Sequence, residues 1–468
     1  MNYKQIITIL LAALLLSSCG IYTNYRRPES LPVDSLYRDV PKVMQDTASL
    51  ADLSWRELFT DPLLVKWIET GLEKNSDLQT ARLQTEQAQA SLKASRLSFL
   101  PSVSLTPQGS LSSFGGEKAS KTYSLGGTFE WEIDAFGELR NAKKGSRASL
   151  EASRAYEQAV RTQLVATIAE TYYSLLAQDC KLDITRETAS QWGENVRVMK
   201  ALKRAGERND AAVAQAEASR LDAESSVLSL EKQIHELENS FSTLIGIIPT
   251  GIERGNLLEL SFKEELSVGV PVQLLGRRPD VRQAEWQLAQ AFYATNEARS
   301  AFYPKITLSG SAGWTNNSGA GIANPGDWLL SAVGSLVQPL FNRGRNIANL
   351  DIAKAQQEQA LIAFAQKLLD AGAEVNNALT EWQTARKNAE LNHRKVETLE
   401  KAVRSTQLLM EHGNTNYLEV LTARQTLLQA QLAEVSDRYE EIQSVISLYH
   451  ALGGGEQIRN GNGYETGF

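Results

Sequence analysis

Four segments of the chain alternate between apolar and polar residues, and each is about ten residues long. In the first segment every even position from Ser102 to Ser112 is polar, and in the third Ile306, Leu308 and Trp314 share the apolar face. The fourth segment alternates poorly, and only its correspondence to the second assigns its faces. The pattern predicts β-strands at residues 101–114, 121–134, 304–316 and 328–340.

Two architectures use strands of this kind. A length near ten residues with one apolar and one polar face is typical of outer-membrane β-barrels, but the strands of a soluble sandwich alternate too. The helices predicted between the strands are far too long to cover a sandwich, which favours the barrel. Because four strands cannot close a barrel and open edges in lipid are costly, the barrel is expected to be shared between copies. The pattern leaves open whether two copies supply eight strands or three supply twelve.

A proline-free stretch, apolar seams late in each half and the correspondence between the two halves predict four long helices, at residues 141–204, 209–245, 344–411 and 415–452. The first of these contains no proline and reaches roughly 100 Å if it is unbroken. A seam typical of coiled coils follows the last helix; it consists of Leu418, Leu421, Gln425, Leu428, Leu432, Val435, Tyr439, Ile442, Ile446 and Tyr449. Gly206 and Gly413 lie where paired antiparallel helices must reverse, because glycine tolerates the left-handed backbone of such turns.

The chain contains an internal duplication. Residues 96–105 (RLSFLPSVSL) resemble residues 299–308 (RSAFYPKITL) at an offset of 203, and Gly206 corresponds to Gly413 at an offset of 207. A period of this length is too long for a solenoid and indicates two similar halves. We therefore divide the chain into a first repeat at 19–258, an equatorial linker at 259–278, a second repeat at 279–455 and a C-terminal tail at 456–468. Each repeat is expected to hold a helix, two strands and two long helices.

The N-terminus resembles a bacterial lipoprotein signal. Lys4 supplies a positive charge, an apolar run extends from Ile6 to Leu16, and small residues precede Cys19 as in a lipobox. Residues 1–18 are therefore interpreted as a signal peptide, with cleavage before Cys19 and acylation of that cysteine. The alternative is an ordinary secretion signal with an incidental cysteine. No run of 18 apolar residues follows Cys19, so we expect no transmembrane helix in the mature chain.

Composition and charge narrow the possible functions. The 48 basic and 55 acidic residues leave a net charge of −7, which argues against a nucleic-acid partner. Cys19 and Cys180 are the only cysteines, so a disulfide scaffold and a structural zinc site are excluded. No hydrolase, metalloprotease or phosphate-loop motif occurs, so we expect no enzyme and no cofactor besides a covalent lipid on Cys19. The remaining rival to a channel is a coiled-coil structural lipoprotein.

Six motifs, in order along the chain, resemble those of the TolC/OprM-type outer-membrane efflux factors, in particular the acylated branch that works with RND pumps. They are YRRP at 25–28, WRELFTDPL at 55–63, WEIDAFG at 131–137, LLGRRPDVRQAE at 274–285, QPLFNRGR at 338–345 and LYHALGGG at 448–455. The resemblance implies an α+β membrane protein that assembles as a homotrimer. Its 12-stranded outer-membrane β-barrel, with four strands per chain, would continue into a 12-helix periplasmic α-barrel with a mixed equatorial domain.

The same resemblance implies a function. The protein would be a passive exit duct in the outer membrane of a Gram-negative bacterium, lipid-anchored and with a large periplasmic extension. It would receive drugs or other small molecules from an inner-membrane RND pump through a periplasmic adaptor. The nearest alternative within the family is the duct of a type I protein secretion system, but the lipobox and the LLGRRPD motif favour efflux.

The resemblance also implies roles for residues near the periplasmic end. The turns at Gly206 and Gly413 correspond to the tips that face the adaptor. Leu418 falls at an apolar ring of the periplasmic gate, Thr422 falls where many relatives carry Asp, and Gln425 falls where they often carry Arg. This departure predicts a gate with an apolar Leu418 ring and weaker electrostatic closure.

Three carboxylates mark the end of the second predicted strand. Glu130, Glu132 and Asp134 share its polar face, which would be the lumen face of a barrel. Repeated around the barrel, they would form an acidic ring that favours cations. The alternative is a solvated face whose charges are incidental.

Overall fold

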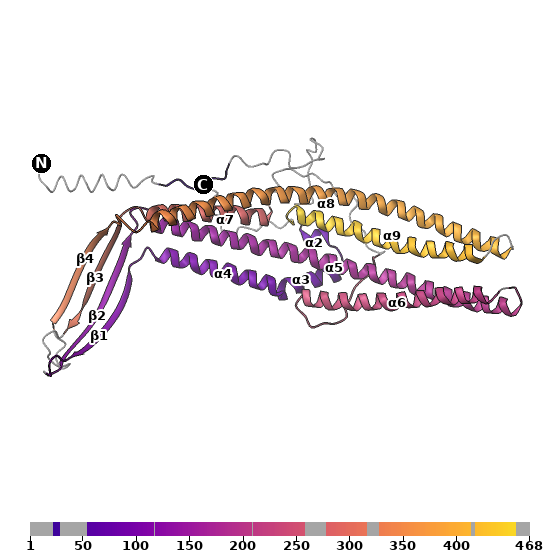
Figure 1. Ribbon diagram of the computed structural model, residues 1–468, viewed down its shortest axis with the longest axis horizontal. Helices are drawn as coiled ribbons and strands as arrows, with labels where there is room; N and C mark the ends of the chain where they lie inside the picture. Colours follow the sequence, from indigo (N-terminus) through magenta and orange to yellow (C-terminus); the bar gives the residue numbers. More distant parts are fainter. Residues whose placement is uncertain are drawn as a thin grey trace.

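The chain is elongated, with a β-sheet at one end and the tips of two helical hairpins at the other (Figure 1). The computed structural model describes residues 22–28, 54–116, 118–207, 209–257, 278–315, 327–412 and 417–454. The expected signal peptide, Cys19, most of the 259–278 linker, Gly413 and the 456–468 tail lie outside the described residues. Among the described helices, none is both long enough and apolar enough to cross a membrane.

The elements follow one another in two similar sets. Two short helices come first, α2 (Trp55–Leu58) and α3 (Pro62–Lys74). The first set is α4 (Ser76–Leu97), β1 (Ser102–Ser112), β2 (Ser120–Ile133), α5 (Glu138–Arg204) and α6 (Asp210–Leu244). The second set is α7 (Pro279–Ser300), β3 (Lys305–Thr315), β4 (Asp327–Val337), α8 (Arg345–Glu411) and α9 (Tyr417–Ala451).

The two sets match in length and in spacing. Helices α4 and α7 have 22 residues each, α5 and α8 have 67, and α6 and α9 have 35. Helix α7 begins at 279, 203 residues after α4 at 76, and α9 begins at 417, 207 residues after α6 at 210. These are the offsets of the sequence repeat, so the sequence duplication is also a duplication of structure. Each 67-residue helix is about 100 Å long.

Proline and glycine define where the strands and long helices meet. Helices α4 and α7 end shortly before Pro101 and Pro304, because proline lacks the N–H that a helix interior requires. Gly137 and Gly344 have φ angles of 81° and 75° and precede α5 and α8. This left-handed backbone, which glycine adopts without a steric penalty, turns the chain from strand to helix. The predicted start of the first long helix at Asn141 is therefore three residues late.

The four strands form one antiparallel sheet in the order β1-β2-β3-β4. Its register places the polar positions of the strands on one face. One polar row crosses the sheet through Ser104, Thr128, Ser311 and Ser331. The adjacent row, on the other face, consists of Leu105, Gly127, Ala312 and Leu330. The pairing with β3 therefore assigns the two faces of β4, which its own sequence does not.

Both faces of this sheet lie open in the single chain. Val103, Leu105 and Leu330 are 78%, 73% and 82% exposed. Within the described residues, β1 and β4 also each keep one edge without a neighbouring strand. A contiguous exposed apolar surface of this kind indicates contact with lipid or with another chain.

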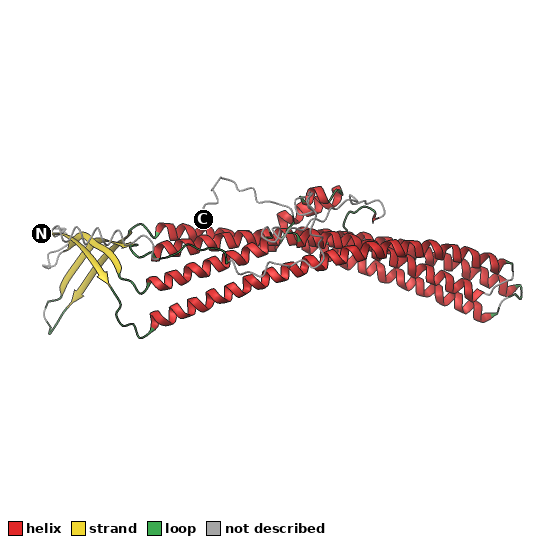
Figure 2. Cartoon of the chain, turned by 90° about the horizontal axis from the view of Figure 1, so that it is seen from above, coloured by secondary structure: helices red, strands yellow, loops and turns green. Residues whose placement is uncertain are grey.

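At the middle of the molecule α2 and α3 pack against one face of the long helices and form the main hydrophobic core. Its largest fully buried side chains include Phe59, Leu64, Ile68, Tyr172, Phe241 and Tyr449. Asp61 caps α3 by accepting a hydrogen bond from Leu63 N, and Tyr172 Oη donates to the same carboxylate at 2.6 Å. Away from the sheet the long helices lie close together, and towards the sheet they spread apart (Figure 2).

Candidate functional site

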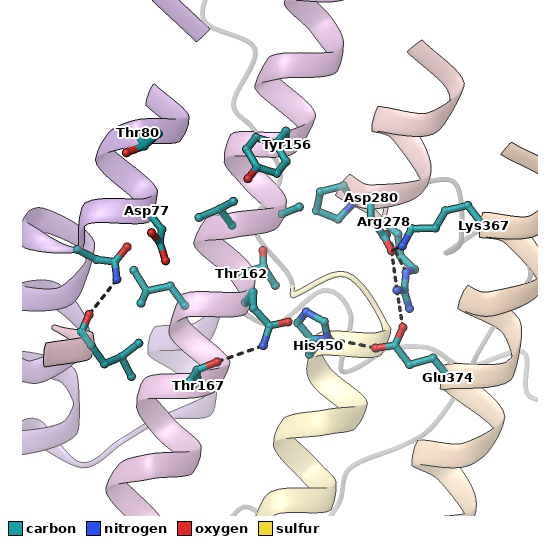
Figure 3. A pocket seen from close by; sticks show the side chains of 17 residues that line it. Asp77, Thr80, Tyr156, Thr162, Thr167, Arg278, Asp280, Lys367, Glu374 and His450 are labelled. Carbon is teal, nitrogen blue, oxygen red and sulfur yellow. Dashed lines mark hydrogen bonds and ion pairs between the residues drawn. The ribbon is translucent and has the colours of Figure 1, made fainter. Parts of the chain in front are cut away.

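The face of the helical layer that α2 and α3 leave uncovered is polar. On α5, Gln163, Thr167 and Glu170 lie on the side opposite Tyr172, which packs into the core. They border two neighbouring cavities of about 600 and 440 Å³. Polar and charged side chains from five helices border the larger one (Figure 3), among them Asp77, Thr80, Tyr156, Arg278, Lys367, Glu374 and His450. This face is therefore suited to contact with water.

The three predicted gate residues lie on one face of α9, because their spacings of four and three residues bring them into line. Leu418, Thr422 and Gln425 are all exposed, and Leu418 is 62% exposed. Thr422 Oγ1 donates a hydrogen bond to Leu418 O at 2.9 Å, so its hydroxyl is satisfied within the helix. The same periodicity continues along α9 to Ser447 and His450, which border the smaller cavity. The gate residues thus lie in the stripe that faces the polar side of the layer.

The adjacent face of α9 packs against the first hairpin, which α5 and α6 form. Tyr417 is buried against Val196, Met199 and Ala216, and Asn195 Nδ2 donates a hydrogen bond to its hydroxyl at 2.9 Å. One turn further on, Leu421 packs with Trp192 and Ala223. Within the single chain, the predicted seam positions Leu421, Val435, Ile442, Ile446 and Tyr449 are buried, whereas Leu418 and Gln425 are exposed. The sequence analysis missed Tyr417 and Asn195, although the four-residue spacing of Tyr417 and Leu421 indicates a shared face.

The tip of the first hairpin is a tight glycine turn. Gly206 has a φ of 81°, Gly206 N donates to Lys203 O, and Glu207 N donates to Leu202 O. Apart from its two chain neighbours, none of the described residues has an atom within 4 Å of the position that a Cβ on Gly206 would occupy. The adaptor contact at Gly206 stays a prediction, and Gly413 lies outside the described residues.

The acidic residues at the end of β2 divide into two groups. Glu130 and Glu132 lie on the polar face of the sheet, opposite Ser309 and Thr307 of β3. Asp134 lies one residue beyond the strand, and its carboxylate accepts hydrogen bonds from Leu139 N and Arg140 N at the start of α5. It also pairs with the Arg140 guanidinium at 3.0 Å, and its side chain is only 7% exposed. Asp134 therefore differs from its predicted place on the lumen face, because it caps a helix.

Among the residues that the structure describes, no group of three or more His, Cys, Asp or Glu side chains is arranged to hold a metal ion. Cys180 is partly buried and unpaired by disulfide, and burial raises the pKa of its thiol. The described helices thus form a layer with two different faces: one packs on α2 and α3, and the other borders the two cavities.

The model of the outer membrane efflux protein family matches residues 67–247 and 270–454, one segment in each repeat and together more than half of the chain. The chain belongs to the outer membrane efflux protein family. The cation efflux system protein CusC of Escherichia coli O6:H1 is 27% identical over 449 residues, which cover 95% of this chain and 97% of CusC. The solvent efflux pump outer membrane protein SrpC of Pseudomonas putida is 27% identical over 462 residues, 96% of this chain and 97% of SrpC.

Solved structures of this efflux family agree. The open-state crystal structure of the MtrE outer membrane channel of Neisseria gonorrhoeae superposes with a TM-score of 0.84 at 28% identity, covering 93% of this chain and 98% of MtrE. The family inferred from the motifs is thus confirmed, and so is the fold class, a mostly helical channel chain with four strands. The protein is an outer-membrane efflux channel.

The motifs that the chain shares with its family contact one another in pairs. Arg27, from YRRP, forms an ion pair with Glu285, from LLGRRPDVRQAE. Arg278, from the same motif, donates through Nη1 to Ala451 O, in LYHALGGG, at 2.7 Å. The contact between Arg278 and Ala451 joins the end of α9 to the start of α7. Because it lies in the second repeat, we call it the second junction. The first junction is its equivalent in the first repeat, where Asn75 Nδ2 donates to Leu244 O at 2.9 Å and joins the end of α6 to the start of α4.

The second junction contains a network of charges. The Arg278 side chain is 4% exposed and binds Asp280 at 2.9 Å and Glu374 at 2.6 Å. Lys367 also reaches Asp280, and His450 Nδ1 lies 3.2 Å from Glu374. Burial acts to raise the pKa of Asp280, but the Arg278 guanidinium and the Lys367 ammonium together outweigh it and lower that pKa to about 2. At Glu374, burial likewise acts to raise the pKa, whereas His450 and Arg278 act to lower it. The net effect is a lowered pKa of Glu374.

Proposed function

We propose that three copies of this chain form a passive exit duct, with a 12-stranded barrel in the outer membrane and a helical tunnel in the periplasm. The observation that carries this proposal is the two-faced sheet with an open edge on β1 and on β4. Unpaired strand edges in lipid cost several kcal/mol per polar group, so β1 of one copy pairs with β4 of the next. Eight strands leave an interior filled by side chains, whereas twelve leave a lumen.

In this assembly the polar face of the sheet and the uncovered face of the helices line the passage. Helices α2 and α3 pack on the other face of the helical layer and stay outside the tunnel. Glu130 and Glu132 of each copy face the lumen and favour cations. Their replacement by Gln should reduce cation preference, and an unchanged reversal potential in a salt gradient would contradict this assignment.

The passage is closed at its periplasmic end by the exposed stripe of α9. Leu418 of the three copies forms an apolar ring, and Thr422 and Gln425 follow it without charge. An apolar constriction resists ion passage by excluding water. The buried contacts of Tyr417 and Leu421 on the adjacent face of α9 connect this ring to α5 and α6.

A lipid on Cys19 anchors each copy at the base of the barrel. Tyr22 packs over Gly137, where β2 gives way to α5, and its ring atoms lie 3.1 Å from the position of a Cβ there. Cys19 precedes Tyr22 by three residues, so the chain between them reaches about 10 Å at most. Segment 22–28 is held along the helices by Tyr25 against Phe292 and by Arg27 with Glu285. A lipid at Cys19 therefore falls at the level where the strands begin.

The partners proposed are a periplasmic adaptor at the hairpin tips, including Gly206 and Gly413, and an inner-membrane RND pump that supplies the energy. CusC and SrpC are named for cation and solvent efflux, and the cargo proposed here is drugs or other small molecules. In this proposal the pump selects the cargo, and the channel imposes little selection of its own.

Native mass spectrometry of the complex extracted from outer membranes tests the assembly. We expect three chains, each beginning at Cys19 and carrying a lipid, and Cys19→Ser should lose the lipid mass. A monomer or a dimer would contradict the trimeric duct. Deletion of the gene should raise the accumulation of a fluorescent drug in cells that hold the adaptor and pump; unchanged accumulation of every drug tested would contradict drug efflux.

A further inference from the structure

The two junctions share a backbone design and differ in chemistry. Five positions of the first junction hold Asn75, Asp77, Val160, Thr167 and Thr243. The corresponding positions of the second, at the repeat offsets of 203 and 207, hold Arg278, Asp280, Lys367, Glu374 and His450. One position in the first set is ionisable, against all five in the second. The two repeats therefore share the helix arrangement but differ in the charge of this junction.

The side chain of Arg278 connects three helices, whereas the side chain of Asn75 connects two. Its guanidinium holds the last turn of α9 through Ala451 O, α8 through Glu374 and the first turn of α7 through Asp280. The Asn75 side chain bonds to Leu244 O of α6 and, through its cap, to Leu78 N of α4, while its backbone N–H donates to Gly71 O of α3. The first junction thus joins its helices through an uncharged side chain with α3 beside it, whereas the second holds its helices through a charged network.

Helix α9 carries the consequence to the other end of the molecule. It spans 35 residues, about 52 Å, from the second junction at Ala451 to Tyr417. A tilt of about 5° at its upper end displaces its lower end by about 4–5 Å, which is the width of a side chain. Leu418, Thr422 and Gln425 lie within the first nine residues of this helix, where that displacement is largest.

We propose that Arg278 is a positioning residue for the gate: it sets the tilt of α9 against α7 and α8, and so the place of the Leu418 ring. This inference rests on the proposed function, because it presumes that α9 carries the gate. In this proposal the second junction, which holds the hairpin of α8 and α9, is adjustable. The first junction, which holds the hairpin of α5 and α6, is fixed. At the lower end Tyr417 and Leu421 guide the motion along α5 and α6.

Distances between spin labels in the assembled, full-length channel test the proposal. The label is placed at Gln425→Cys, with Cys180→Ser removing the free thiol, and a matched control label at Ala218→Cys, the exposed position 207 residues earlier on α6. In the Arg278→Asn variant, which copies the first junction, we expect longer and broader distances between copies at 425 and unchanged ones at 218. Unchanged distances at 425, or equal changes at both positions, would overturn the proposal.

Two further variants separate positioning from folding. Arg278→Lys keeps the charge, and its distance distribution at 425 should return most of the way to that of the wild type. If the guanidinium fork has a purely structural role, the distribution in Arg278→Lys will instead be as disturbed as in Arg278→Asn. If Arg278→Asn fails to assemble, Glu374→Gln, which leaves the bond to Ala451 O, is measured in the same way and should broaden only the distances at 425. If the variant forms an intact trimer with unchanged distances, only the positioning role of Arg278 is refuted. If the wild type itself gives no measurable distance between copies, the trimeric duct is refuted.

Discussion

The first and second junctions solve one structural problem with two kinds of chemistry. In both, a long helix ends in a glycine with positive φ, Gly246 at 73° and Gly453 at 99°. In both, the next residue donates back to the helix, Ile247 N to Ser242 O and Gly454 N to Tyr449 O. The backbone is thus the same while the side chains differ, mostly uncharged in the first junction and all ionisable in the second. The comparison shows that backbone geometry limits the junction more tightly than polarity does.

The largest effect should come from placing a side chain on the tighter of the two glycines. In Gly246→Ala the new Cβ would lie 2.5 Å from Lys74 O, in a left-handed conformation. We expect a loss of about 3 kcal/mol or more, since strained backbone alone costs about 1–3 kcal/mol. Gly453→Ala, whose Cβ would lie 3.4 Å from Arg278 Cα, should cost about 1–2 kcal/mol. Thermal unfolding of the two variants checks this, and equal losses would show that the first junction has room to relax.

The next effect compares the side chains that make the junctions. Arg278→Ala leaves Asp280 and Glu374 without their main partner and should cost about 2–3 kcal/mol, less than a fully buried pair because Glu374 is 41% exposed. Asn75→Ala removes the cap of α4 and one bond to α6 and should cost about 1 kcal/mol. Denaturant unfolding of both variants provides the measurement. A larger loss for Asn75→Ala would contradict the greater role given to the charged junction.

A smaller effect should appear in acid and only at the second junction. The pKa of Asp280 is lowered to about 2 and that of Glu374 is lowered as well, so both carboxylates favour the folded state when ionised. Their contribution is fully present above the unfolded pKa near 4 and is lost as the pH falls towards about 2. The unfolding temperature should therefore fall less steeply between about pH 4 and pH 2 in Arg278→Asn than in the wild type. Equal slopes would mean that Arg278 does not depress these pKa values.

The sequence predicts the elements of this fold better than their contacts. The alternation placed strands at 101–114 and 304–316, and the observed strands are Ser102–Ser112 and Lys305–Thr315. Such patterns are local, because each strand face and helix stripe repeats within a few residues. Asp134 shows where such local patterns fail. Its position fits the alternation of β2, but its carboxylate accepts hydrogen bonds from the N–H groups at the start of α5.

Contacts between distant residues had no comparable signal. Arg278 and Ala451 are 173 residues apart, and Asn195 and Tyr417 are 222 apart. Their motifs identified the family but did not indicate which motif touches which. The repeat offsets relate position 75 to 278 and position 244 to 451. Once the contact between Asn75 and Leu244 is known, these offsets therefore indicate the contact between Arg278 and Ala451.

Conductance of the purified channel in planar bilayers tests the central claim, that three chains form a duct closed by the Leu418 ring. The wild type should show a low closed-state conductance, and Leu418→Ser should raise it severalfold, because a hydroxyl lets water enter the ring. Leu221→Ser on α6, at an exposed leucine of the first hairpin, serves as the control and should leave the conductance unchanged. An unchanged closed-state conductance in Leu418→Ser, in a variant that still forms trimers, would contradict this account of the gate.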